Sequence, residues 1–125
     1  MRVEEFKITD KPWGFEELLT VTESYVMKKI SINPGQRLSL QYHEEKEETI
    51  YIASGECYVW VSDDDDERIV LKAGDVYHVK PGEVHRFGAP DYMHSKYNDE
   101  KPCILIECST TQLTDVVRIS DDYKR

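Results

Sequence analysis

Residues 34–55, PGQRLSLQYHEEKEETIYIASG, decide the fold of this chain. Within residues 37–43 apolar side chains alternate with polar ones, which is the period of a β-strand whose successive side chains point to opposite faces. The polar face carries Gln41 and His43. Such a face usually points to solvent, and the alternative is a polar cavity.

The next predicted strand, residues 48–53, favours the cavity. Glu48 shares its face with Ile50 and Ile52, so its carboxylate is expected to point toward the apolar interior. An unpaired charge is costly in such a place, and a metal ion or another cation must compensate it.

The same strand-like pattern extends over most of the chain. Apolar, β-branched and aromatic residues form short segments that glycine-containing turns interrupt roughly every eight to twelve residues, which is typical of an all-β sandwich or barrel. Helical signals are limited to a turn or two at residues 15–21 and 112–116, and residues 89–101 are expected to form one long loop. We predict strands over residues 25–32, 37–43, 48–53, 56–61, 68–71, 75–79, 85–88 and 103–108.

Size and charge narrow the possible functions. A chain of 125 residues is expected to form a single domain over residues 1–125. Its formal net charge of −9 argues against binding to nucleic acid or to an anionic membrane surface. No apolar run approaches the roughly 18 residues of a membrane span, and the first residues lack the apolar core of a signal peptide, so a cytoplasmic location is expected.

Two other residue groups are expected to have structural roles. The three cysteines, Cys57, Cys103 and Cys108, form no CxxC pair and are predicted to be free, mostly buried thiols. The acidic run at residues 63–67 lies between two predicted strands and lacks a glycine-turned calcium loop, so it is interpreted as a solvated hairpin.

The spacing of chemically reactive residues resembles that of the cupin superfamily. Residues 35–55 resemble the first cupin motif, with Gln41 in place of its first histidine, and residues 74–85, from Gly74-Asp75 to His85, resemble the second. The resemblance implies an all-β fold, the cupin double-stranded β-helix, which is a jelly-roll-like barrel. It also implies a divalent-metal site made of Gln41, His43, Glu48 and His85. An amide oxygen can still bind a hard or borderline cation, so Gln41 is retained as a candidate ligand.

Three further segments resemble a narrower family, the type II mannose-6-phosphate isomerase cupin. They are Lys11-Pro12-Trp13-Gly14, residues 34–43, and residues 117–123. This resemblance implies interconversion of mannose 6-phosphate and fructose 6-phosphate with a bound divalent ion, whether zinc, manganese, cobalt, nickel or iron. A metal ion suits the reaction because it polarises a carbonyl as a Lewis acid.

Some positions depart from the isomerase pattern. Lys46 stands where that family usually carries arginine, and Thr49-Ile50 replaces its His-Trp pair. Arg118 and Arg125 match family arginines and are candidates for holding a phosphate or orienting the sugar. Glu107 shares strand parity with Leu105, so it is expected to point inward as a proton-transfer group or as a structural hydrogen-bonding group.

Two alternatives to the isomerase remain open at this point. One is a non-catalytic cupin that binds a sugar or a sugar-nucleotide, and the other is a metal cupin enzyme of different chemistry. A homodimer formed through sheet edges is also expected, because an exposed strand edge needs covering. His78 and His94 are interpreted as surface residues, and Trp13 as an apolar anchor for an N-terminal strand.

Overall fold

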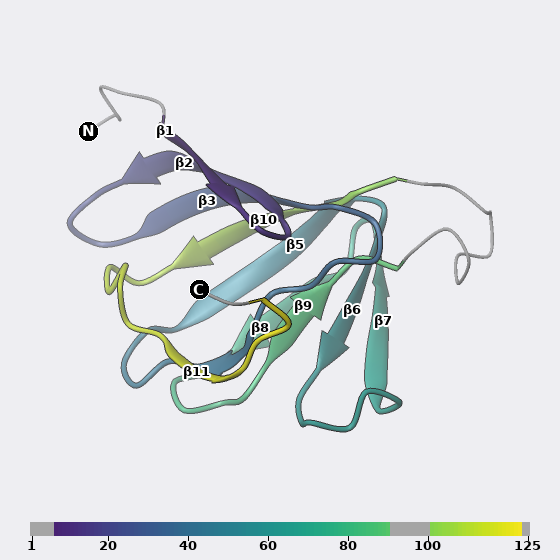
Figure 1. Cartoon of the computed structure of the whole chain (residues 1–125). Helices are drawn as coiled ribbons and strands as arrows, with labels where there is room; N and C mark the ends of the chain where they lie inside the picture. Colours follow the sequence, from purple (N-terminus) through teal and green to yellow (C-terminus); the bar gives the residue numbers. More distant parts are fainter. Residues whose placement is uncertain (1–6, 91–100, 124–125) are drawn as a thin grey trace.

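The structure, a computed structural model, describes residues 7–90 and 101–123 and confirms the predicted all-β fold. Within these ranges the chain forms strands and no helix (Figure 1). The strands are β1 (Lys7–Lys11), β2 (Gly14–Val21), β3 (Val26–Ile32), β4 (Leu40–Tyr42), β5 (Glu48–Ser54), β6 (Glu56–Trp60), β7 (Arg68–Lys72), β8 (Val76–Val79), β9 (Arg86–Gly88), β10 (Cys103–Ser109) and β11 (Val117–Ser120).

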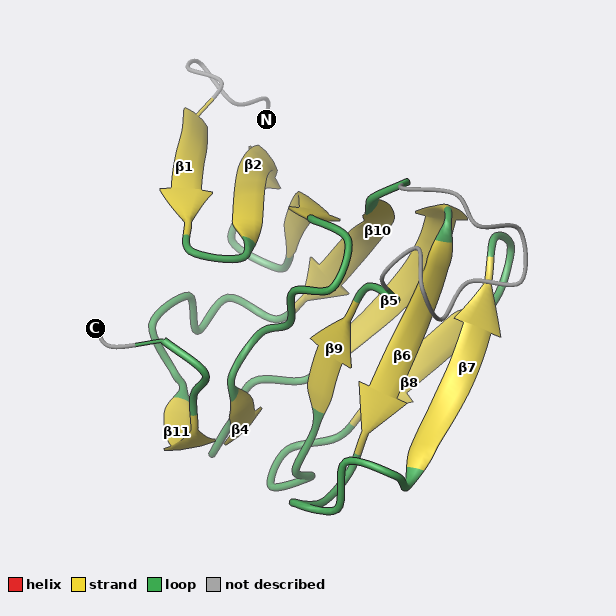
Figure 2. Ribbon diagram, turned by 45° about the vertical axis from the view of Figure 1, so that its right-hand side comes forward, coloured by secondary structure: helices red, strands yellow, loops and turns green. Residues whose placement is uncertain are grey.

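The strands form two facing sheets and a short additional pair. The larger sheet has the order β1-β2-β3-β10-β5-β8, and the smaller has the order β7-β6-β9, with all neighbours antiparallel. Figure 2 shows β9, β6 and β7 lying in front of β10, β5 and β8. The β4–β11 pair continues beside β9, because Gln41 and His85 pair through two backbone hydrogen bonds.

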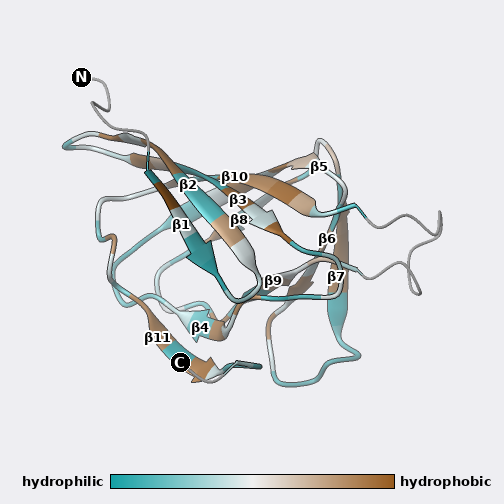
Figure 3. Cartoon of the chain, turned by 45° about the horizontal axis from the view of Figure 1, so that its top comes forward, coloured by the Kyte–Doolittle hydropathy of each residue, from teal (hydrophilic) through white to brown (hydrophobic). Residues whose placement is uncertain are grey.

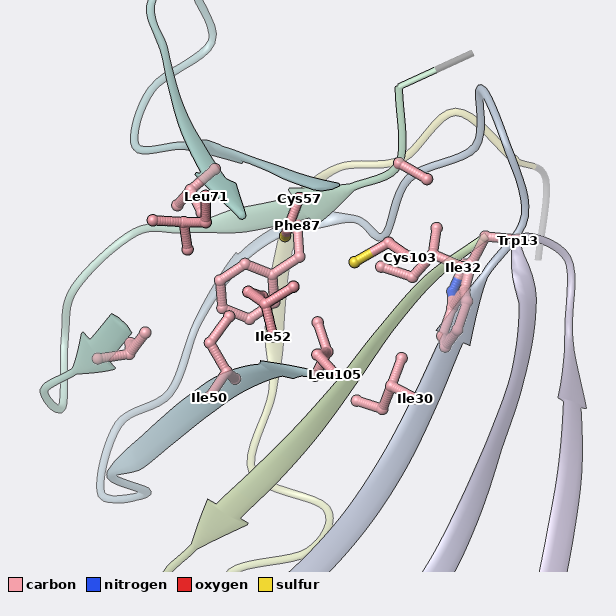
Figure 4. Close-up of a cluster of buried hydrophobic side chains, with 13 residues drawn as sticks. Trp13, Ile30, Ile32, Ile50, Ile52, Cys57, Leu71, Phe87, Cys103 and Leu105 are labelled. Carbon is pink, nitrogen blue, oxygen red and sulfur yellow. The ribbon is translucent and has the colours of Figure 1, made fainter. Parts of the chain in front are cut away.

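Side chains from both sheets fill the space between them (Figure 4). Ile50, Ile52 and Leu105 come from the larger sheet, and Val59 and Phe87 come from the smaller one. Each is almost fully buried, and burial of such a side chain stabilises the fold by about 1.5–3 kcal/mol. The outermost strand β1 is largely hydrophilic, whereas β10 begins with a run of apolar residues (Figure 3).

The helical turn predicted for residues 15–21 is wrong, because these residues form β2. Strand β2 pairs with β1 on one side and with β3 on the other, so sheet hydrogen bonds replace helical ones. Gly14 at its start has φ +153° and lies against β3, where an added Cβ would be 2.0 Å from the carbonyl oxygen of Ser31. This close approach of two strands leaves no room for a side chain at position 14.

Other segments also differ from the prediction by more than one residue at an end. The strand expected over residues 37–43 is regular only in β4, although Arg37 still bridges Gly88 and Leu38 N–H donates to the Phe87 carbonyl. The segment at residues 112–116 forms a turn and no helix. Strand β11 was not predicted, and the N-terminal strand expected beside Trp13 had been given no bounds. The predicted long loop lies mostly outside the described residues.

An ion-pair network attaches the C-terminal segment to the barrel. The guanidinium of Arg37 contacts both carboxylate oxygens of Asp122 and, at 2.9 Å, Asp65 in the acidic loop. Buried Arg86 donates to the backbone carbonyls of Leu38 and Ser120. These contacts hold β11 beside β4.

The structure bears on two further expectations. Cys57 and Cys103 are free and buried as predicted, and Cys108 is free but exposed. Over the described ranges no helix is long and apolar enough to cross a membrane. The homodimer stays a prediction.

Candidate metal centre

Three candidate metal ligands meet at one end of the barrel. Glu48 is the first residue of β5, His43 directly follows β4, and His85 directly precedes β9. All three side chains are almost completely buried. Because Gln41 and His85 are paired, their side chains lie on the same face, which is the interior.

The ligand atoms lie at separations that suit one cation. Glu48 Oε1 lies 3.0 Å from His85 Nε2 and 3.6 Å from His43 Nε2, and the three candidate ligand atoms lie within 4.8 Å of one another. A metal ion about 2.0–2.2 Å from each nitrogen and oxygen requires separations of roughly 3–4 Å. The two separations from Glu48 fall in this range, so the cluster His43, Glu48 and His85 could hold a divalent ion.

The hydrogen bonds of the two histidines orient their free nitrogens toward this point. His43 Nδ1 lies 2.6 Å from the Asp115 carbonyl oxygen, and His85 Nδ1 lies 3.0 Å from that of Glu83. A carbonyl only accepts, so each Nδ1 carries a proton and each Nε2 faces the Glu48 carboxylate. Such backbone acceptors commonly orient metal-binding histidines.

The buried charge of Glu48 favours a cation between the three groups. The carboxylate of Glu48 is buried, and the His43 Nε2 atom has no hydrogen-bond partner within the described part of the chain. Burial acts to lower the pKa of His43, but Glu48 and the Asp115 carbonyl outweigh it and raise that pKa. Burial likewise opposes ionisation of Glu48, whereas contacts with His43, His85 and Lys46 hold its pKa well below the usual range. A proton or a metal ion between these groups satisfies the site.

Gln41, the fourth candidate ligand, lines the same cavity. Its amide nitrogen donates to the Ser39 carbonyl at 3.3 Å, which leaves the amide oxygen free to act as an acceptor. Ligation by Gln41 stays a prediction.

Lys46 and Glu107 extend the buried charge network. Lys46 Nζ lies 3.2 Å from Glu107 Oε2 and 3.2 Å from Glu48 Oε2, the latter an ion pair without hydrogen-bond geometry. Burial acts to lower the pKa of Lys46, but the two carboxylates outweigh it and raise that pKa. Burial, followed by the charge of Glu48, raises the pKa of Glu107 to about 7.

Replacing Lys46 by methionine is expected to lower the free energy of unfolding by about 3 kcal/mol, because removing one partner of a buried ion pair leaves a charge uncompensated. Denaturant unfolding of the metal-free protein measures this change. Lys28→Met is the matched control: its ion pair with Glu16 at 3.6 Å is partly exposed and is expected to contribute less than about 1 kcal/mol. Equal effects of the two substitutions would contradict the role of Lys46.

The cluster opens into a cavity of about 320 Å³, a size that accommodates a small organic molecule. Arg118 on β11 lines it and is directly opposite Gln41 across the β4–β11 pair. Arg125 lies outside the described residues, as does His94. The apolar part of the lining includes Trp13 from the segment between β1 and β2 and Phe87 from β9.

Several residues of this cavity were not among the predicted site residues. Lys11 and Lys28 line it and share the carboxylate of Glu16 at 4.0 and 3.6 Å. For Lys28 the sequence contained a usable signal: it lies two residues before buried Ile30 and therefore on the same, inward face of the strand. Asp115 was also missed, because its contacts come from a part of the chain distant in sequence.

The departures from the isomerase pattern have unequal structural importance. Thr49 is absent from the cavity lining and its hydroxyl contacts His78 Nδ1 at 2.9 Å. His78 also pairs with Glu47 at 2.8 Å and is exposed. Lys46, in contrast, is buried inside the site.

A double-stranded β-helix with a buried His-Glu-His cluster defines the class of this protein. The family model described as a cupin domain matches residues 28–95, which is more than half of the chain, and the chain belongs to the cupin family. Among solved structures, a conserved protein with a double-stranded β-helix domain from Klebsiella pneumoniae subsp. pneumoniae MGH 78578 superimposes with a TM-score of 0.66. That alignment has 21% sequence identity and covers 82% of this chain and 81% of the other, so it supports the fold alone.

Curated relatives come from carbohydrate biosynthesis. The xanthan biosynthesis protein XanB of Xanthomonas campestris pv. campestris is 28% identical over 118 residues, covering 92% of this chain and 23% of XanB. A mannose-1-phosphate guanylyltransferase of Escherichia coli K12 is also 28% identical over 118 residues, covering 92% of this chain and 22% of the enzyme. This chain thus spans about a quarter of these relatives, and the matches are consistent with the resemblance to the isomerase cupin.

Proposed function

We propose that this cupin is a metal-dependent aldose–ketose isomerase that interconverts mannose 6-phosphate and fructose 6-phosphate. The observation that carries the proposal is the convergence of His43 Nε2, His85 Nε2 and Glu48 Oε1 at the base of a cavity. Both histidines have their other nitrogen bonded to a backbone carbonyl, so these three acceptor atoms are available to one cation.

The proposed metal ion is held by His43, Glu48 and His85, with Gln41 as a fourth ligand. When bound, a divalent ion supplies Lewis-acid polarisation of the substrate carbonyl and stabilises the charge that develops on oxygen. These side chains would leave part of the coordination shell of the ion open to substrate oxygens, unlike a closed structural zinc site.

The remaining residues have distinct proposed roles. Glu107 is the acid–base group that moves a proton between neighbouring substrate carbons, because its buried carboxyl lines the cavity beside Glu48. Lys46, 3.2 Å from Glu107, holds and neutralises that carboxylate. Arg118, Lys11 and Lys28 provide positive charge for the phosphate. Arg125 remains a proposed substrate contact on the basis of the family resemblance.

The buried hydroxyl of Ser39 provides a further polar contact for a sugar. It lines the cavity and its oxygen has no hydrogen-bond partner within the described ranges. An unsatisfied buried hydroxyl is costly, and a substrate hydroxyl group would satisfy it. This feature agrees with a polyhydroxy ligand.

A second candidate function is supported by Lys46. Its ammonium lies 3.2 Å from Glu48 Oε2 and partly compensates the carboxylate without a metal ion. A metal-free cupin that binds a sugar or sugar-nucleotide without catalysis is therefore the alternative to the isomerase.

The deciding experiment measures conversion of fructose 6-phosphate to mannose 6-phosphate by the purified protein after chelation of metals and reloading with zinc, manganese, cobalt, nickel or ferrous iron. We expect turnover that disappears on chelation and returns with at least one of these ions, because the substrate carbonyl needs an electrophile. Absence of turnover with every ion would contradict the isomerase. Binding of the same sugar phosphate, measured by calorimetry, would then favour the alternative, a cupin that binds a sugar without catalysis (the binding module).

A further inference from the structure

Asp115 lies in the segment between β10 and β11 and binds the loop that links the candidate ligands His43 and Glu48. Its carboxylate accepts hydrogen bonds from the backbone N–H groups of Glu44 at 3.0 Å, Glu45 at 2.8 Å and Lys46 at 2.9 Å. These contacts lower the pKa of the Asp115 carboxyl, since they favour its ionised form. One side chain thus holds the loop at residues 44–46.

The backbone of the same residue acts on the imidazole ring. The Asp115 carbonyl oxygen accepts the proton of His43 Nδ1 at 2.6 Å. The ring is thereby held in the tautomer whose Nε2 lone pair faces Glu48. The carboxylate contacts and this carbonyl contact belong to one residue, so displacement of the loop would also displace the ring.

A neighbouring contact completes the attachment of the loop. Glu47 N–H donates to Thr110 Oγ1 at 3.0 Å, and Thr110 N–H donates to the Glu47 carbonyl at 3.0 Å. Residues 110–115 therefore hold the backbone N–H of every residue between His43 and Glu48. The loop between these two ligands is thus attached to a segment that contributes no proposed ligand itself.

We infer that Asp115 is a positioning residue of the metal centre: it sets the tautomer of His43 and the spacing between His43 and Glu48. The inference rests on the proposed metal function and assigns Asp115 no contact with metal or substrate. Groups that orient metal ligands typically change metal affinity by 10–100-fold when they are removed.

The test compares Asp115→Ala with wild-type protein by two measurements. Calorimetric titration with zinc is expected to give an affinity lowered about 10–100-fold. Nitrogen NMR of the metal-free protein, recorded at a pH above the titration measured for that ring, is expected to show His43 changing from the Nδ1–H tautomer to a mixture. The signals of His85, whose Nδ1 is held by the Glu83 carbonyl, should not change.

Asp75→Ala is the matched control, because the Asp75 carboxylate also accepts a backbone N–H, that of Lys72 at 2.7 Å, but lies outside the cavity lining. It should change neither measurement. Asp115→Asn keeps one acceptor oxygen and should lower zinc affinity by roughly threefold or more, and it decides the matter if the alanine variant does not fold.

Wild-type zinc affinity and an unchanged His43 tautomer in a folded Asp115 variant would overturn the inference. If the wild-type protein itself binds no zinc, the proposed metal function fails. The tautomer comparison then decides the role of Asp115 alone: a shift supports it, and identical spectra refute it.

Discussion

Replacing His85 by alanine is expected to abolish stoichiometric metal binding while leaving the barrel folded. The imidazole supplies one of three converging ligand atoms, and Nε2 lies 3.0 Å from Glu48 Oε1. The remaining protein ligands, His43 and Glu48 with the weaker amide of Gln41, should not retain an ion against dilution, because a metal site depends on ligand number and geometry. Elemental analysis after gel filtration measures the metal content, and circular dichroism reports the fold.

His78→Ala is the control for this experiment. His78 is exposed and pairs with Glu47 and Thr49 outside the cavity, so its removal should leave metal content unchanged. The barrel core consists of apolar side chains from both sheets and does not require the imidazole of His85. Undiminished metal content in the folded His85→Ala protein would eliminate the proposed site.

Glu107→Gln is expected to lower kcat for sugar-phosphate isomerisation by roughly 100- to 10,000-fold, the usual contribution of a positioned acid–base group. Glutamine has nearly the same shape and can still accept a hydrogen bond from Lys46, but it cannot take up the substrate proton. Metal content should stay at the wild-type value, since Glu107 is not a proposed ligand. Steady-state kinetics with the metal-loaded protein measures the effect.

Glu47→Gln provides the comparison for this prediction. The carboxylate of Glu47 lies on the exposed surface, where it pairs with His78, and the substitution should not alter kcat. A Glu107→Gln protein with wild-type kcat would show that Glu107 only makes structural hydrogen bonds, which was the alternative for this residue.

These predictions separate the two proposed functions through different residues. Loss of metal in the His85 variant tests the centre itself, whereas the Glu107 variant tests catalysis at an intact centre. The Lys46→Met variant adds information on the metal-free state, because the ammonium group of Lys46 contacts both Glu48 and Glu107. A protein whose stability depended on Lys46 and which bound no metal would correspond to the binding module.

Local sequence patterns were sufficient for the fold class and for part of the site. Strand alternation indicates which face a side chain takes, so Glu48 and Glu107 could be assigned to the interior. Motif spacing then indicated His43 and His85 by resemblance. Alternation cannot distinguish a short helix from a strand in residues 15–21, and pairing of β2 with two neighbours was needed to decide.

The amino-acid sequence by itself therefore determined an all-β chain and the inward orientation of its buried carboxylates, because strand periodicity is a local property. Only the tertiary structure decided which groups meet. Lys46 and Glu107 are 61 residues apart, and His43 and Asp115 are 72 residues apart, yet both pairs are in contact. Strand order and register create such contacts, and a local pattern contains no information about a partner on a distant strand.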